Sequence, residues 1–110
     1  MREGMAVSNR GSLEAIHSEH RLLAILRVLN MLPENKGNLP LMRDWLDAVG
    51  LAASMDTVRA DLRSLKEKAL IELHETELSW PIILTERGED AAEGRLKIEG
   101  VCKAGPGCVY

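Results

Sequence analysis

The sequence predicts a mainly α-helical domain with one small β-hairpin. Apolar residues recur at spacings of three and four in three stretches between residues 12 and 69, as on the buried face of a helix. From residue 70 the spacing changes to two, and two short alternating stretches flank a polar turn, as in a hairpin. With 110 residues, 45% of them hydrophobic, the chain is the size of one domain with a modest core. Because it has no Phe, the core is expected to be aliphatic, with Trp45 and Trp80 as its large pieces.

Helical structure is expected within residues 12–32, where residues 12–20 form either a separate first helix or the start of a single one. Its apolar residues lie three or four positions apart, and a proline and a glycine in the segment 32–38 indicate a loop after it. Residues 1–11 carry no such stripe and are expected to form a flexible N-terminal arm. The stripe of this helix consists of Leu22, Leu23, Ile25, Leu26, Leu29 and Leu32.

The second and third helices are expected to be separated by a short turn. Asn38 can cap the second helix, whose first turn holds Pro40, and Gly50 is placed to end it. Ser54 can cap the third helix, which is expected over residues 54–69. The buried stripe of the third helix is expected to be Met55, Val58, Leu62, Leu65 and Ala69.

The hairpin is expected where the apolar spacing becomes two. Pro81 cannot donate a ladder hydrogen bond, so the second strand is expected to have one open edge. A short last helix is expected between Thr85, which can cap it, and Gly94, which ends it. The inward residues of the two strands are expected to be Ile71, Leu73, Ile82 and Leu84.

This order of elements is typical of a winged helix-turn-helix, with a three-helix core, a two-stranded wing and a short extra C-terminal helix. The winged-helix domain is expected over residues 12–94, and residues 95–110 form a C-terminal tail. The tail holds apolar residues in a segment too short for a core of its own. It is therefore expected to be mobile or to pack against a second copy, in a homodimer formed through the first helix and the tail.

Two runs of the sequence resemble a known class of proteins. "SMDTVRADLRSLKEKALIEL", residues 54–73, resembles the Ser-x-x-Thr-Val-Arg-x-Asp-Leu-x-x-Leu-x-x-x-Gly-Leu-Ile run of many bacterial winged-helix transcription regulators. "LTERGEDAA" is similar to the start of the helix after their wing. Through these runs, "HRLLAILRVL" and a tail with "GV" and "GPG", the whole chain resembles small winged-helix proteins encoded by Mu-like phages and prophages. The resemblance implies a phage-borne, DNA-binding regulator of transcription.

The third helix departs from the broader class at two positions. Many of those regulators carry two adjacent arginines, whereas the second position here is Ala60, which removes one expected DNA contact. The glycine that commonly ends the helix is replaced by Ala69. Alanine in a left-handed conformation would cost about 1 kcal/mol, so the helix is expected to end differently.

The third helix is the expected recognition helix for double-stranded DNA. Arg59 and Arg63 are four positions apart, so they point the same way, and each can bind a guanine with two hydrogen bonds. Thr57 can contact a phosphate or a thymine methyl, and the helix N-terminus favours an anion. Lys36 and Arg43 are candidates for phosphate contacts elsewhere. The expected DNA-facing residues of the helix are Ser54, Asp56, Thr57, Arg59, Ala60 and Arg63.

The charge of the chain opposes this interpretation. The formal net charge is −3, whereas DNA-binding domains usually carry a basic patch. Arg59 can also pair with Asp56, and Arg63 with Glu67, along a solvated helix face. The wing holds no Lys or Arg and is expected to stay off the DNA backbone. Its acidic residues are Glu72, Glu75 and Glu77.

A protein-interaction module is the alternative, since one fold can serve several functions. An acidic wing with exposed Leu78 and Trp80 can dock on a basic or apolar surface of another phage protein. No enzyme, cofactor or metal is expected, because no nucleophile–base arrangement, phosphate-binding glycine loop or ligand set is visible. Cys102 and Cys108 are expected to be free thiols, with a tail disulfide or a weak metal contact as the alternatives. Without a signal peptide or an apolar span, a cytoplasmic location is expected.

Overall fold

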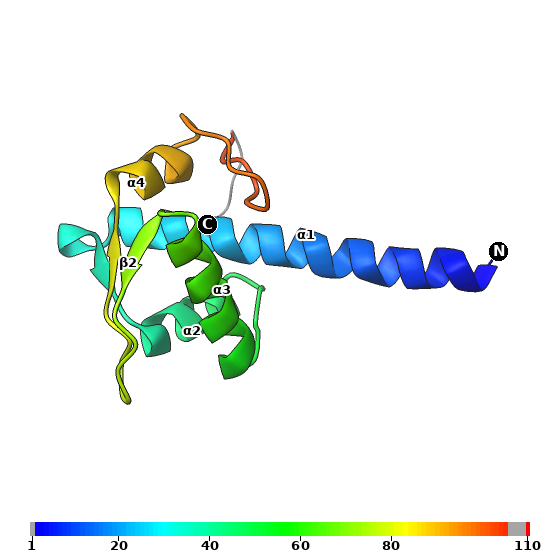
Figure 1. The fold of residues 1–110 in the computed structure, drawn as a ribbon, viewed down its shortest axis with the longest axis horizontal. Helices are drawn as coiled ribbons and strands as arrows, with labels where there is room; N and C mark the ends of the chain where they lie inside the picture. Colours follow the sequence, from blue (N-terminus) through cyan, green and yellow to red (C-terminus); the bar gives the residue numbers. More distant parts are fainter. Residues whose placement is uncertain (1, 106–109) are drawn as a thin grey trace.

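The computed structural model describes residues 2–105 and Tyr110, with side chains from Leu13 onward. Over these residues the chain is mainly helical, with four α-helices and a small three-stranded antiparallel sheet, an arrangement compatible with a winged helix (Figure 1). The helices are α1 (Arg2–Met31), α2 (Leu39–Ala48), α3 (Met55–Glu67) and α4 (Glu86–Ala92), and a 3₁₀ turn, η1, spans Pro33–Asn35. The strands are β1 (Lys36–Gly37), β2 (Ile71–Leu73) and β3 (Ile82–Leu84).

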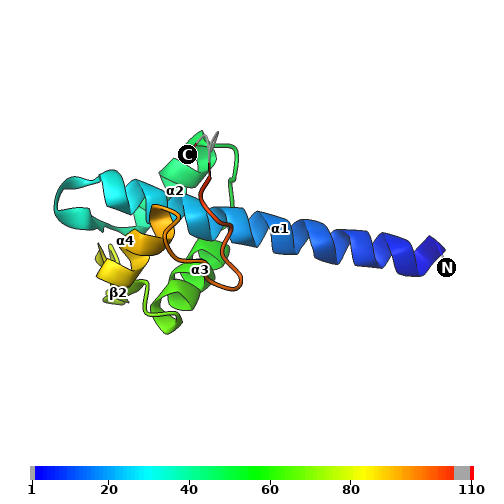
Figure 2. The ribbon, with the colours of Figure 1, turned by 90° about the horizontal axis from the view of Figure 1, so that it is seen from above.

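The helix α1 reaches well beyond the rest of the domain. Its N-terminal half projects away from the other helices, while its C-terminal half lies among them (Figures 1 and 2). Residues 13–17 are exposed, and continuous burial begins at Arg21. The segment 1–11, expected to be an arm, has helical backbone from Arg2 onward and is part of α1. It contains no proline, and its two glycines weaken a helix without forbidding it.

The expected caps of the three shorter helices are confirmed. The side chain of Asn38 accepts a hydrogen bond from the backbone N–H three positions on, and Ser54 and Thr85 do the same for α3 and α4. Gly50 and Gly94 follow α2 and α4 with φ of 80°, the left-handed conformation that glycine adopts without strain. Local capping chemistry therefore sets where each of these helices begins and where α2 and α4 end.

The end of α3 uses the same left-handed turn, but with an alanine. Ala69 has φ of 61°. Its N–H donates to the Lys66 carbonyl at 3.0 Å, and the Leu70 N–H donates to the Leu65 carbonyl at 3.0 Å. This pair of bonds is the Schellman motif, so the expectation that α3 would end differently is wrong. Ala69 was expected on the buried stripe of α3 but is exposed. Leu70 is fully buried instead, and its burial offsets a strain of about 1 kcal/mol at Ala69.

The wing belongs to a sheet with the strand order β1-β3-β2. The central strand β3 pairs with β2 on one side, and with Lys36 and Gly37 of β1 on the other. The expected hairpin of two strands is confirmed. The expectation that its second strand has an open edge is wrong, because β1 covers that edge. Pro81 lies just before β3, where the ladder needs no N–H donor. A strand of two residues has no periodicity, which is why the sequence predicts only a loop over residues 32–38.

The core is aliphatic, as expected. Trp80 is buried within it, as expected for a core residue, so the alternative expectation that Trp80 is exposed on the wing is wrong. Trp45 is half-buried and donates its Nε1–H to the Ala24 carbonyl at 3.1 Å. The core joins α1, α2, α3, α4 and the sheet, so that these helices and the base of the wing share one apolar interior. Its fully buried larger side chains are Leu23, Ile25, Leu26, Leu29, Met42, Leu46, Val58, Leu62, Leu65, Leu70 and Ile82.

The C-terminal segment packs on its own domain. The Cys102 N–H donates to the Glu19 carbonyl of α1 at 3.1 Å, and the Tyr110 hydroxyl hydrogen-bonds the Nδ1 of His20. The apolar tail residues thus find partners within the chain, and packing of the tail against a second copy stays a prediction. Cys108 lies outside the described residues, as does any pairing that involves it. The tail residues in the core are Ile98, Val101 and Ala104.

Candidate nucleic-acid interface

The helix α3 is fixed to the domain by an apolar face and one buried ion pair. Val58, Leu62 and Leu65 are fully buried. Asp61 lies on the same side and accepts a hydrogen bond from the Arg21 Nε of α1 at 2.7 Å. Because a buried charge without its partner is costly, the pair favours one rotation of α3 against α1. That rotation decides which side chains of α3 face outward.

Burial dominates the electrostatics of this ion pair. Removal from water raises the pKa of the Asp61 carboxyl, and the hydrogen bond and charge of Arg21 offset only part of that rise. Neither Arg21 nor Asp61 is among the residues that the sequence predicted to be important. The sequence contained an indication that both residues are buried. Arg21 directly precedes the apolar run of α1, and Asp61 directly precedes Leu62, which belongs to the buried stripe of α3.

The first turn of α3 carries several of the expected DNA-facing residues. The Ser54 Oγ accepts from the Thr57 N–H at 3.1 Å and donates to the Thr57 Oγ1 at 2.9 Å, so this hydroxyl is occupied in capping. Asp56 is exposed and accepts from the Arg59 Nη1 at 3.0 Å, which confirms the expected pair. Ala60 is exposed and adds no charge. This turn therefore presents one arginine balanced by one carboxylate.

The side chain of Arg63 binds the wing instead of its own helix. Its Nε and Nη2 donate to the two carboxylate oxygens of Glu75 at 3.2 and 2.8 Å, a two-pronged contact. The pair suggested with Glu67 is not the one that forms. The hydrogen bond with Glu75 raises the pKa of Arg63, and the same bond lowers the pKa of Glu75. Both effects favour the charged forms of the two groups.

The wing also places an aromatic ring against both outward arginines. The Cζ atoms of Arg59 and Arg63 lie 5.8 and 5.0 Å from the ring centroid of Trp80, within cation–π range. Trp80 has φ of 49°, and its N–H donates to the Thr76 Oγ1 at 3.2 Å. The structure thus brings Arg59 and Arg63 together on one surface, as their spacing predicted, and adds Trp80 and Glu75 to it.

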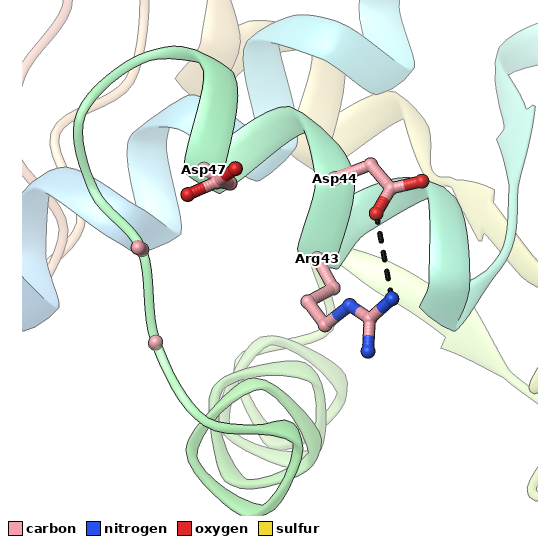
Figure 3. A pocket seen from close by; sticks show the side chains of 5 residues that line it. Arg43, Asp44 and Asp47 are labelled. Atoms are coloured by element: carbon pink, nitrogen blue, oxygen red, sulfur yellow. Dashed lines mark ion pairs between the residues drawn. The ribbon is translucent and has the colours of Figure 1, made fainter.

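The two remaining phosphate candidates lie on other elements. Lys36 is on β1, with its Nζ 3.2 Å from Glu34, and Arg43 is on α2, with its Nη2 3.6 Å from Asp44. Arg43 lines a surface pocket of about 300 Å³ with Asp44, Asp47 and two alanines of the turn before α3 (Figure 3). One guanidinium and two carboxylates make the pocket net negative, which is unfavourable for a phosphate.

Metal binding and membrane crossing find no support in the part of the chain that the structure describes. Among those residues, no group of three or more His, Cys, Asp or Glu side chains is placed to hold a metal ion. None of the helices in this part has the length and apolar character that a membrane crossing requires. The charged surface of α3 and the wing is therefore the feature to consider for binding.

The fold and this surface define a small, mainly helical protein that presents two arginines of one helix beside an acidic hairpin. No protein-family model matches the chain, and no solved structure matches it. The chain is 38% identical over 91 residues to gp26 of Escherichia phage Mu, an uncharacterized protein, and the match covers 83% of this chain and 94% of that protein. The chain therefore belongs to the family of phage Mu gp26, which supports the expected origin in a Mu-like phage.

Proposed function

We propose that this protein is a winged-helix regulator of a Mu-like prophage that binds double-stranded DNA through α3. The observation that carries the proposal is the gathering of Arg59 and Arg63 over Trp80 on the outward face of α3. The opposite face of the helix is held by the core and by the Asp61 ion pair, so the two guanidiniums stand on a rigid support. Rigid support of this kind favours recognition of base edges.

The DNA contacts are assigned to three side chains of α3, to its N-terminus and to two basic residues outside it. Arg63 and Arg59 bind guanine edges in the major groove, and Thr57 contacts a phosphate or a thymine methyl. The N-terminus of α3 adds an anion-favouring dipole. The acidic wing stays off the DNA backbone, and Lys36 contacts a phosphate at the rim of the interface. Arg43 is a weaker candidate for a phosphate contact, because two carboxylates share its pocket.

The test is selection from a pool of prophage DNA fragments, followed by a salt titration of binding to the enriched sequence. We expect one sequence class to be enriched and its affinity to fall steeply as salt rises. Arg63→Ala and Arg59→Ala should each weaken binding about 10-fold or more, from the loss of a bidentate base contact. Arg95→Ala is the matched control, because it removes an exposed, carboxylate-paired arginine outside α3. Absence of any enrichment at low salt would contradict the proposal.

A protein-interaction role is the second candidate, and the wing tip favours it. Leu78 is 89% exposed beside Glu77, on a hairpin that carries no Lys or Arg. An apolar tip on an acidic hairpin suits a phage protein with a basic, apolar groove. If DNA selection fails, Leu78→Ser should abolish capture of such a phage protein while leaving the fold intact, and this candidate then leads.

The remaining expectations stay part of the proposal. The protein is proposed to be a cytoplasmic, non-enzymatic homodimer without a cofactor. The tail packs on its own domain, so the dimer contact is assigned to the projecting half of α1, where Leu13 and Ile16 are exposed. Sedimentation at tens of micromolar tests this, since a monomer there would rule out the dimer.

A further inference from the structure

The Arg63–Glu75 contact joins two elements whose charges would otherwise act separately. Arg63 is on the outward face of α3, and Glu75 is on the wing, 12 positions further along the chain. Their side chains are 56% and 36% exposed, so the contact lies at the surface where a nucleic acid would approach. Lys66 adds a second positive charge near the same carboxylate, where it lowers the pKa of Glu75.

The geometry of the contact is that of an anion bound by arginine. The Nε and Nη2 of Arg63 form the two-pronged fork that also binds a phosphate or a guanine edge, and the carboxylate of Glu75 occupies that fork. The guanidinium lies over the buried ring of Trp80, with its Cζ 5.0 Å from the ring centroid. An incoming phosphate therefore has to displace a carboxylate before it can use this fork.

The wing is built to hold Glu75 in this position. Thr76, the next residue, accepts hydrogen bonds from the N–H groups of Ser79 at 3.3 Å and Trp80 at 3.2 Å, which closes the tip. The Ser79 carbonyl accepts from the Leu39 N–H at 2.8 Å, which ties the tip to the start of α2. The carboxylate is thus presented by an anchored loop.

We infer that Glu75 is a specificity-determining residue, which occupies the fork of Arg63 and so suppresses sequence-independent binding to DNA phosphates. The inference rests on the proposed function. A single phosphate gains little by displacing a carboxylate that already makes two hydrogen bonds. A correctly placed guanine makes two hydrogen bonds with Arg63 and adds to the other contacts of α3. These contacts together offset the loss of the hydrogen bonds between Arg63 and Glu75. Opposition to the wrong ligand is a general route to specificity.

The experiment measures binding of the full chain to a mixed-sequence duplex as a function of salt, for wild type and Glu75→Gln. We expect Glu75→Gln to bind this duplex about two- to five-fold more tightly, the range for release of an exposed ion pair. The slope of log affinity against log salt should steepen by about 0.9, because Arg63 then neutralises one further phosphate. Glu77→Gln is the matched control, since it removes the same charge from the same wing tip; it should leave the slope unchanged.

A second background separates the role of Arg63 from general loss of negative charge. In an Arg63→Ala chain, Glu75→Gln should have no larger effect than Glu77→Gln. An equal effect of the two glutamine substitutions in the wild-type background would overturn the inference. So would the absence of any gain with Glu75→Gln. If wild type still enriches a sequence class from the prophage pool, the proposed function survives that failure. If no class is enriched while Glu75→Gln steepens the slope, the proposed function and the role of Glu75 in specificity fail, and only its suppression of phosphate binding is upheld.

Discussion

Replacement of Ala69 by glycine should stabilise the protein, although it removes a methyl group. Ala69 has φ of 61°, a left-handed conformation that costs an L-residue roughly 1–2 kcal/mol. Glycine adopts this conformation freely, but it loses more backbone entropy on folding, which costs about 0.4–1 kcal/mol. The methyl group is exposed, so its removal forfeits little burial. The Thr85 Oγ1 donates to the Ala69 carbonyl at 2.8 Å, and glycine keeps that carbonyl.

The balance of these effects is a gain of about 0.5–1 kcal/mol in the free energy of unfolding. With an unfolding entropy of roughly 2.1 cal/mol/K per residue, a chain of 110 residues should show a rise in Tm of about 2–4 °C. Urea unfolding followed by circular dichroism measures the free energy directly. The m-value should not change, because the surface exposed on unfolding is nearly the same.

The matched control is Ala60→Gly, the same substitution at an exposed position within α3. There the alanine has helical conformation, so glycine should destabilise the protein by about 0.5–1 kcal/mol. The two substitutions are therefore expected to have opposite signs. If Ala69→Gly also destabilises the protein, Ala69 does not hold a left-handed conformation in solution, and the assignment of the α3 terminus is refuted.

Three further predictions address the core, the base of the wing and the surface ion pair. Asp61→Leu leaves the buried Arg21 without a partner and should cost about 3–5 kcal/mol in urea unfolding, whereas Arg21→Met with Asp61→Leu should recover most of that loss. No recovery in the double variant would mean that the pair is not the cause. Gly88→Ala would place a Cβ 2.1 Å from the Leu70 carbonyl oxygen and should cost about 1–3 kcal/mol or more; an unchanged Tm would contradict this packing. Arg63 lowers the pKa of Glu75 in the folded protein below its ordinary value of 4.5. The stability that their contact contributes should therefore be present above about pH 4.5 and be lost as the pH falls through the pKa of Glu75 in the folded state. Carboxyl NMR of Glu75 should show a titration midpoint below 4.5 that returns toward the ordinary value in Arg63→Ala, and a normal midpoint in wild type would disprove the contact.

The features that sequence analysis located correctly depend on residues close together in the chain. Asn38, Ser54 and Thr85 cap helices through N–H groups only three positions away, so their types and positions suffice to place those helix starts. Asp56 and Arg59, which form an ion pair, are also only three positions apart. Each of these interactions forms whenever the local backbone is helical, whatever the rest of the fold does.

The features that were missed depend on contacts between distant segments. Arg21 and Asp61 are 40 positions apart and meet only when α1 packs on α3. The strand β1 forms because its two residues pair with β3, and a pattern of two residues cannot predict that pairing. Arg63 had an acidic neighbour at the helical spacing, yet the two-pronged contact with Glu75 of the wing is the one that forms. In each of these cases the packing of distant segments, and not the spacing of neighbouring residues, determines the contact.

The end of α3 and the charge of its surface are linked through one junction. The Thr85 Oγ1 donates to the Ala69 carbonyl and accepts from the Gly88 N–H, while the Thr85 N–H donates to the Leu70 carbonyl at 3.1 Å. One residue thus joins the left-handed turn after α3, the base of the wing and the first turn of α4. The direction in which the wing leaves α3 is set at this junction, and that direction carries Glu75 to Arg63. The hydrogen bonds of Thr85 hold the left-handed turn, so this turn tolerates an alanine at position 69. The pairing of Arg63 with Glu75 therefore depends on how α3 ends as well as on the charges that α3 carries.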